Sequence, residues 1–404
     1  MKIVHINFSS DTGGAAIAVK RLHELLCDEN VDSNLVVCES NADVAKVNKI
    51  NKTYEKIKNE IKKSISRNLK YVFKTKNKNT HSLNIFPSNL VKIVNNLNPD
   101  IVNLHWIGNE TISISDISKF KSKIVWTLHD MWPFCGAEHY TTSERYIEGY
   151  NEKNRPSDES GIDINKIIWK KKLKNYNKIE SIICSSKWLF DCAKKSYLFK
   201  DKKIKEIPLI LNDKFWKPYN KESARNFFGY SNNEKIILIG GSELIKNKRK
   251  GFERIEKIIN SSTEENNFKF LFFGDSDKSK LKSSNPNLIN LGYVKDEYSL
   301  KLIYSCADLV IIPSKQEAFG LVAYEAIHCG KPCLIFKDNG LSSIIDHKKN
   351  GYICETENKE NIMKGISWCL ENLINKEEEI SNLAKMKFDK KQIIQSYLSF
   401  IKEN

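Results

Sequence analysis

Short apolar segments alternate with longer amphipathic segments along the chain, which is the pattern of parallel sheets covered by helices on both faces. In the first half of the chain the strand candidates are Lys2–Phe8, Asn34–Cys38, Asp100–His105, Lys123–His129 and Glu180–Ser185. In the second half they are Lys235–Gly240, Phe268–Gly274, Asn287–Leu291, Asp308–Pro313 and Pro332–Phe336. We therefore expect an α/β fold with two Rossmann-like, doubly wound domains.

The domain boundary is expected in Ile207–Tyr219, an irregular stretch that contains two prolines. A chain of 404 residues is too long for one compact core. We assign residues 1–210 to an N-terminal domain and residues 211–388 to a C-terminal domain. Residues 389–404 carry a last helix, Lys391–Ile401, which we expect to pack back on the N-terminal domain.

The net charge of +15 is concentrated in one segment. Residues 44–78 contain 12 Lys or Arg and 2 Asp or Glu, so this segment carries +10 and the remainder of the chain only +5. A charge this local argues against a nucleic-acid partner. Apolar residues recur in the segment at helical spacing, and they are Ile50, Tyr54, Ile57, Ile61, Ile65, Leu69 and Val72. Two interpretations stay open: a helix packed on the first domain, or a surface helix that lies on anionic lipid.

The sequence predicts a cytoplasmic location, with peripheral attachment to the inner face of the membrane as the further expectation. No apolar run approaches the roughly 18 to 20 residues needed to cross a bilayer. The first residues, Met1–Phe8, resemble a β-strand more than a signal peptide. The ten cysteines are scattered, and Cys329 and Cys333 lack a second pair, so we expect reduced thiols and no metal site.

The strongest chemical signal is the segment Pro313–Glu325. A buried strand ends here, and a helix begins near Gly320, where free amides and the positive end of the helix dipole can hold a diphosphate. Glu317 precedes this helix, and Glu325 lies about one turn inside it. Because the helix is otherwise apolar, Glu325 needs a partner.

The first half offers candidate groups at the ends of its strands. Gly13 and Gly14 follow the first strand, and they are either an ordinary turn or a loop that lets donor and acceptor approach the backbone. His129 ends a strand, so in a doubly wound sheet it points into the ligand crevice. The acceptor candidates are His105, Asp130 and His139.

Taken together, these motifs resemble glycosyltransferase family 4, the retaining glycosyltransferases of the GT-B fold. EAFGLVAYE matches the E-x7-E signature of that family, and SDTGGAAIAVKRLHELL resembles its N-terminal glycine loop and helix. TLHDMWPFCG, LGYVKDEYSLKLIYSCADLVIIPS and KPCLIF follow in the expected order, so the resemblance covers most of the chain. It implies two domains facing each other across a cleft.

The resemblance also implies roles for single residues. Glu317 would contact the donor sugar and Glu325 the ribose, while the backbone of Phe319, Gly320 and Leu321 would cap the diphosphate. Lys250 matches the diphosphate-binding lysine, Val294 the backbone that reads the base, and His129 a histidine at the sugar. The usual arginine about five residues before the lysine is missing, and Arg249 is expected to replace its charge.

The implied activity is that of a metal-independent hexosyl- or related glycosyltransferase. It would move a sugar from a nucleoside-diphosphate sugar to a glycan or lipid-linked acceptor, with retention and without a cofactor, in cell-surface polysaccharide, lipopolysaccharide or lipid-linked glycan synthesis. Two alternatives stay open. One is a catalytically silent sugar-nucleotide-binding subunit, and the other is a sugar-nucleotide epimerase.

If residues 44–78 bind lipid, replacing six of their lysines with glutamine should abolish salt-sensitive binding to anionic vesicles. Near an anionic surface each basic residue contributes at most on the order of 1 kcal/mol before salt screening. Cosedimentation at low and high salt measures this, with neutral vesicles as the control. A wild-type chain that does not sediment with anionic vesicles at low salt contradicts the lipid interpretation.

Overall fold

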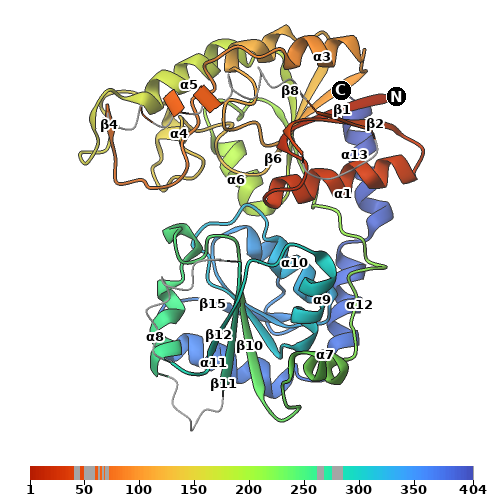
Figure 1. The fold of residues 1–404 in the computed structure, drawn as a ribbon. Coiled ribbons are helices and arrows are strands. Elements are labelled where there is room, and N and C mark those ends of the chain that lie inside the picture. The colour runs from red at the N-terminus through yellow and green to blue at the C-terminus, as the bar shows by residue number, and fades with distance from the viewer. Residues whose placement is uncertain are drawn as a thin grey trace. The chain divides into compact units, whose positions relative to one another are not determined.

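The structure is a computed structural model that describes residues 1–40, 46–49, 60–61, 64–65, 68, 72–261, 268–274 and 285–403. The chain divides into two compact units, residues 1–210 with 391–404 (the first unit) and residues 211–390 (the second unit). Each unit is built around one parallel sheet with helices beside it (Figure 1). The expected α/β fold of two Rossmann-like domains is confirmed.

The sheet of the first unit has seven strands in the order β3-β2-β1-β5-β6-β8-β9. Apolar strands buried on both faces, such as β1 with Ile3, Val4 and Ile6 fully buried, are what a parallel sheet covered by helices requires. The strand bounds are β1 (Lys2–Ser9), β2 (Asp32–Glu39), β3 (Val47–Lys49), β5 (Ile101–Leu104), β6 (Lys123–Leu128), β8 (Ile179–Cys184) and β9 (Lys203–Glu206).

Helix α1 lies against β1 and β2, and α3 and α5 lie on the other side of the same sheet (Figure 1). Two short antiparallel strands, β4 (Phe73–Lys74) and β7 (Ser160–Gly161), pair with each other and join two loops of this unit. The helices are α1 (Gly14–Asp28), α3 (Leu90–Asn96), the 3-10 helix η2 (Ile114–Lys119), α4 (Arg145–Glu148), α5 (Ile164–Asn175), α6 (Lys187–Lys195) and α13 (Lys390–Lys402).

The sheet of the second unit has six strands in the order β12-β11-β10-β13-β14-β15. Helices α10 and α12 cover one face, and α8 and α11 cover the other (Figure 1). The strands are β10 (Lys235–Gly240), β11 (Phe268–Phe273), β12 (Leu288–Gly292), β13 (Leu309–Ile312), β14 (Cys333–Phe336) and β15 (Gly351–Cys354). The helices are α7 (Lys221–Phe228), the 3-10 helix η3 (Lys248–Lys250), α8 (Glu253–Ser261), α9 (Glu297–Cys306), α10 (Leu321–His328), the 3-10 helix η6 (Gly340–Ser343), α11 (Lys359–Asn372) and α12 (Glu377–Lys387).

The order of the strands reverses once in each sheet, between β1 and β5 in the first unit and between β10 and β13 in the second. In an open α/β sheet, ligands bind outside the carboxyl ends of the strands at such a switch point. The segments that follow β10 and β13 contain Lys250 and Glu317. The topology therefore places both residues at the switch point of the second unit.

All ten expected strands are present, each with its ends within two residues of the expected ones. Five further strands of the described chain were not expected: the two-residue strands β4 and β7, and β3, β9 and β15 in the parallel sheets. Strand β9 is only half-buried, and β3 and β15 are three and four residues long, so none of them has a long apolar run.

Within the helical insertion expected at 44–78, the described residues 60–61, 64–65 and 68 are helical, whereas β3 and β4 form strands. Ile50, Tyr54, Ile57 and Leu69 lie outside the described residues. Ile61, Ile65 and Val72 are described, and their exposed fractions are 56%, 45% and 44%. These three side chains therefore do not support the interpretation of a helix packed on the first domain. In the described part of the chain, no helix is both long and apolar enough to cross a membrane.

Helix α10 begins at a glycine that no other residue can replace without strain. Gly320 has φ +109° and ψ 73°, a backbone conformation that residues with a Cβ rarely adopt. A Cβ there would lie 2.2 Å from Leu341 Cδ2, and Leu341 is fully buried. The loop on which Leu341 stands is tied to the same turn, because the Gly340 N–H donates to the Glu317 carbonyl over 2.8 Å.

We expect Gly320→Ala to lower the free energy of unfolding by about 2 to 4 kcal/mol, because backbone strain and overpacking add. Gly229→Ala is the matched control. Gly229 also has a positive φ (+74°), but a Cβ there meets nothing within 4 Å, so its loss should be about 1 kcal/mol. Urea unfolding of both variants measures the difference. Equal losses would mean that Leu341 moves aside at little cost.

Candidate functional site

Three charged side chains meet at the switch point of the second unit. The Lys250 ammonium donates to Glu317 Oε2 over 2.6 Å, and Arg249 Nη1 lies 3.6 Å from the same oxygen. The Ser314 hydroxyl donates to that oxygen over 3.3 Å. The side chains of Arg249, Lys250 and Glu317 keep exposed fractions of 12%, 17% and 15%. We call these three residues the charge cluster.

The charge cluster stabilises an ionised carboxylate. Burial by itself would raise the pKa of Glu317, but Lys250 and Arg249 outweigh it and hold that pKa below its ordinary value. Burial also lowers the pKa of Lys250, although Glu317 opposes this effect. With two cations and one anion, the cluster has a net positive charge and can attract an anionic ligand.

Backbone contacts fix the two loops that carry the cluster. The Lys315 N–H donates to the Arg249 carbonyl over 2.8 Å, and Arg249 Nη1 donates to the Gln316 carbonyl over 2.5 Å. Arg254 Nη1 donates to the carbonyl oxygens of Pro313 and Ser314 over 3.1 Å each. The loop after β10 and the loop after β13 are therefore joined independently of the Lys250–Glu317 pair.

A third segment supports the same turn, and the sequence analysis missed it. The Asn339 side-chain amide donates to the carbonyl oxygens of Ser314 and Phe336, both over 3.1 Å. Its Oδ1 accepts from the Leu341 N–H over 2.9 Å. Asn339 is nearly fully buried, and its position directly after a buried strand was the signal that could have identified it.

Glu325 is separate from the charge cluster in its contacts. Its side chain is 4% exposed, and Glu325 Oε2 accepts a hydrogen bond from the Tyr304 hydroxyl over 3.1 Å. Tyr304 lies on α9 and is the partner that an acid in an apolar helix requires. Phe319 is buried against Tyr324, and Val294 follows β12 at the edge of the sheet.

In the first unit, Gly13 ends the loop between β1 and α1 and Gly14 is the first residue of α1, and both are exposed. Gly13 has φ +92° and precedes the first turn of α1, and a Cβ there would meet nothing within 4 Å. The Ser9 hydroxyl accepts from the N–H groups of Asp11 and Thr12 over 3.3 and 3.2 Å, which fixes the entry to the loop.

Two of the three acceptor candidates, His139 and Asp130, are buried in the first unit and form hydrogen bonds with its own groups. His139 Nδ1 lies 2.6 Å from Asp130 Oδ2, and His139 Nε2 lies 2.8 Å from the Ser82 hydroxyl. Asp130 also accepts from Trp106 Nε1 over 2.7 Å and from the Trp132 N–H over 3.0 Å. Both side chains are buried and engaged by protein groups, and the expectation that His139 and Asp130 meet the acceptor stays a prediction.

The third acceptor candidate, His105, is also buried and engaged by protein groups, and its contact with the acceptor stays a prediction. Its two ring nitrogens face ring nitrogens of His5 and His129, both at 3.0 Å, and its side chain is nearly fully buried. His129, in contrast, is half-buried at the carboxyl end of β6. Among these histidines of the described chain, His129 therefore keeps the exposure that a substrate contact needs.

Lys172 on α5 holds the turn that follows His129, and the sequence analysis missed it. Its buried ammonium donates to the carbonyl oxygens of Trp132, of Cys135 over 3.1 Å and of Gly136 over 2.6 Å. Burial lowers the pKa of this lysine to about 7. Helix α5 contains several lysines, and nothing in the sequence distinguishes Lys172 from the others as the one that binds these carbonyl oxygens.

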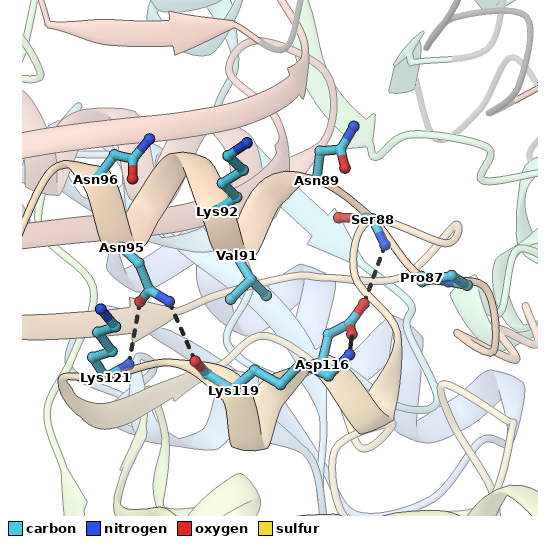
Figure 2. Close-up of a pocket in the computed structure, with 10 residues that line it drawn as sticks. All are labelled: Pro87, Ser88, Asn89, Val91, Lys92, Asn95, Asn96, Asp116, Lys119 and Lys121. Atoms are coloured by element: carbon cyan, nitrogen blue, oxygen red, sulfur yellow. Dashed lines mark hydrogen bonds and ion pairs between the residues drawn. The ribbon is translucent and has the colours of Figure 1, made fainter.

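A surface groove of the first unit lies between α3 and η2 (Figure 2). Its acid, Asp116, accepts from the Ser88 N–H over 3.1 Å and from the Lys119 ammonium over 2.7 Å. The Asn95 amide links the backbone of Lys119 and Lys121. None of the residues predicted for donor, sugar or acceptor lines this groove.

The thiols and the acidic groups of the chain do not assemble into a metal centre in the described residues. No group of three His, Cys, Asp or Glu side chains there could hold a metal ion. All ten cysteines are unpaired, and most of them are buried.

The sequence of the second unit matches a known family. The profile of the glycosyl transferases group 1 matches residues 220–387. An uncharacterized glycosyltransferase of Methanocaldococcus jannaschii is 29% identical over 177 residues, which are 42% of this chain and 44% of that protein. Alpha-galactosylglucosyldiacylglycerol synthase of Streptococcus pneumoniae is 24% identical over 242 residues, which are 56% of this chain and 61% of that protein. The matches thus span less than two thirds of either relative.

The fold also has a solved counterpart. The crystal structure of Anabaena HepE in complex with UDP and glucose superposes with a TM-score of 0.66 at 14% identity, over 100% of both chains. At this identity the likeness concerns the fold alone. The parallel sheets, the switch point and the solved structure agree on the fold: this chain has the fold of the GT-B glycosyltransferases, and residues 220–387 match the profile of the glycosyl transferases group 1.

Proposed function

We propose that the chain is a retaining hexosyl- or related glycosyltransferase that moves a sugar from a nucleoside-diphosphate sugar to an acceptor hydroxyl. The observation that carries the proposal is the charge cluster of Arg249, Lys250 and Glu317 beside the first turn of α10. The complex of Anabaena HepE with UDP and glucose supports this class of donor.

The two cations of the cluster suit a diphosphate. Lys250 and Arg249 share one carboxylate oxygen of Glu317, so the cluster keeps one positive charge in excess. The first turn of α10 adds backbone N–H groups that have no partner within the helix, at Leu321 and the residues that follow. The positive φ of Gly320 forms the tight turn that leads into these N–H groups.

The reaction develops negative charge on the departing diphosphate, and this site has to stabilise that charge. The bond between the anomeric carbon and the diphosphate oxygen breaks, and the bond to the acceptor oxygen forms on the same face of the sugar. The departing diphosphate oxygen takes the acceptor proton. Lys250 and Arg249 stabilise the negative charge that develops on the diphosphate, and Glu317 faces the oxocarbenium-like sugar.

Glu325 suits a different contact. Its carboxylate is held by the Tyr304 hydroxyl on α9, which fits a role at the ribose, remote from the reacting carbon. His129, at the carboxyl end of β6, is proposed to lie at the sugar, and the exposed loop at Gly13 and Gly14 is proposed to admit donor and acceptor.

The acceptor is proposed to be a cell-surface glycan, a lipopolysaccharide precursor or a lipid-linked glycan. The relative from Streptococcus pneumoniae is named as a synthase of a glycosyldiacylglycerol, which supports an acceptor at a membrane. The basic segment at residues 44–78 would hold the protein at an anionic surface, on the inner face of the membrane.

The two glutamates should respond differently when each is replaced by glutamine. Glu325→Gln should raise the donor KM by about 10-fold or more, because a hydrogen bond to a charged group contributes about 1.5–3 kcal/mol equally in ground and transition states. Glu317→Gln should lower kcat by roughly 100-fold or more with the donor KM little changed, because positive charge develops on the sugar only in the transition state. Steady-state kinetics with a soluble acceptor measures both.

Glu355→Gln is the control for these variants, because Glu355 follows β15, is exposed to solvent and pairs with Lys337, away from the charge cluster. It should leave both constants unchanged. A near-normal kcat of Glu317→Gln would show that Glu317 does not face the reacting sugar. Free nucleoside diphosphate should appear only after an acceptor is added, and its absence with every donor would favour the silent binding subunit.

Activity should survive chelation of divalent ions, because Lys250, Arg249 and the first turn of α10 supply the positive charge at the leaving group. Turnover before and after treatment with EDTA measures this. Activity that is lost and then restored only by Mg²⁺ or Mn²⁺ would contradict it. Such a result would direct attention to Asp275 and Asp277, which follow β11 in the sequence and lie outside the described residues.

A further inference from the structure

Polar side chains lie on one face of three neighbouring strands in the first unit, β1, β5 and β6. In the register of the sheet, His5 on β1 is level with Asn103 on β5. His105 is two residues beyond Asn103, and His129 is two residues beyond Thr127 on β6. Because side chains alternate between the faces of a strand, the three histidines share one face and step diagonally toward the carboxyl edge of the sheet.

The three imidazoles form a continuous chain. His5 Nδ1 lies 3.0 Å from His105 Nε2, and His105 Nδ1 lies 3.0 Å from His129 Nε2. The ring centroids are 5.2 and 5.3 Å apart. His5 and His105 are almost fully buried, and His129 is half-buried. We call these residues the histidine chain.

The histidine chain is neutral at physiological pH. Burial lowers the pKa of His5 to about 3 and that of His129 to about 4, and it lowers the pKa of His105 well below the ordinary value. The neighbouring titratable groups do not reverse this effect. His23 on α1 faces His5, and Asp130 follows His129 but is engaged by His139 and two N–H donors.

Counting protons leaves only two arrangements. Each neutral imidazole carries one N–H, and each of the two nitrogen–nitrogen contacts needs one proton. His105 therefore donates in one contact and accepts in the other. The third proton of the chain must lie at one of its ends, either on His5 Nε2 or on His129 Nδ1.

The surroundings of the two ends decide between these arrangements. His5 Nε2 is buried and has no hydrogen-bond partner among the described residues. Burying an N–H group without a partner costs about 1–3 kcal/mol, and orphaned buried N–H groups are rarer than orphaned acceptors. His129 Nδ1 is at the half-buried end, at the carboxyl edge of the sheet. The third proton is therefore favoured on His129.

We infer that the histidine chain is oriented outward, from His5 through His105 to His129, so that His129 presents a fixed Nδ1–H donor to a hydroxyl oxygen of the sugar or acceptor. His105 and His5 are then positioning residues, because they set the protonated nitrogen of His129 without touching substrate. This inference rests on the proposed function, and it gives His129 the role of a neutral hydrogen-bond donor rather than a general base.

That role agrees with the chemistry of the site. When the departing diphosphate takes the acceptor proton, no base is needed in the first unit. A neutral imidazole can still orient and polarise a hydroxyl group, as a buried imidazole of low pKa does in other enzymes. The buried chain behind His129 prevents the exchange of its two tautomers, so the donor is present in every turnover.

The first experiment needs no substrate. Long-range 1H–15N correlation spectra of the full-length protein, labelled with 15N-histidine, report which ring nitrogen carries the proton. At pH 7.5, His129 should have a protonated Nδ1 and an unprotonated Nε2, with His129→Gln used to assign its signals. A His129 protonated at Nε2, or at both nitrogens, overturns the inference.

Variants of His105 test the positioning role. His105→Leu removes the donor to His129 Nε2, so His129 should lose its preference for the Nδ1–H tautomer and kcat should fall about 10-fold with the donor KM changed less than about 3-fold. His105→Asn keeps a short N–H donor and should stay within about 3-fold of wild type. His23→Leu removes another buried histidine of the same unit and should leave the tautomer of His129 unchanged.

The pH dependence of His105→Leu distinguishes a donor from a base. As pH falls toward about 4, the pKa that burial gives His129, the His129 of the variant gains a proton and again carries Nδ1–H, so the activity of the variant relative to wild type should rise. If His129 were a base, the variant would lose activity as pH falls, and a falling ratio of variant to wild-type activity overturns the inference.

If His105→Leu does not fold, the wild-type spectrum and the Asn variant decide. If no donor is ever turned over, the proposed function fails, while the spectrum still decides the tautomer.

Discussion

Parallel strands end at one common edge, and every chemical group of this protein is positioned by that constraint. Polar side chains collect where the strands end, and they lie close to a buried sheet, so each needs a partner. In the second unit the partners of Glu317 are two cations from the loop after β10. In the first unit the partners of the edge histidine are other histidines, further back on the same sheet face.

The sequence was sufficient for the parts of the fold that repeat a regular pattern. Long apolar strands and the motif around Glu317 were identified because their signals lie within one contiguous segment. The pairing of Arg249 with Glu317 matches the expectation that Arg249 supplies the missing charge, although its contact with a phosphate stays a prediction. Short strands such as β15 were missed because four residues at a sheet edge carry too little periodicity.

Side-chain partners across the sheet could not be predicted, because spacing along the chain shows which edge a residue reaches but not its neighbour. His105, Asp130 and His139 were expected to face an acceptor, yet their hydrogen-bonding atoms are engaged with groups 2 to 100 residues away. His5 is a polar residue between apolar residues of β1, which indicates a buried histidine. Only the register of β1 against β5 shows that this histidine lies near His105.

The contacts that join the two loops of the charge cluster have a consequence for the evolution of this protein. Arg249 and Arg254 bind carbonyl oxygens of residues 313–316, and such contacts do not depend on which side chains those residues carry. Lys315 and Gln316 can therefore drift in sequence while the loop keeps its shape. Substitutions at these two positions can change the side chains beside the charge cluster without moving Arg249 and Lys250. Selection for a new substrate can therefore change these two residues first.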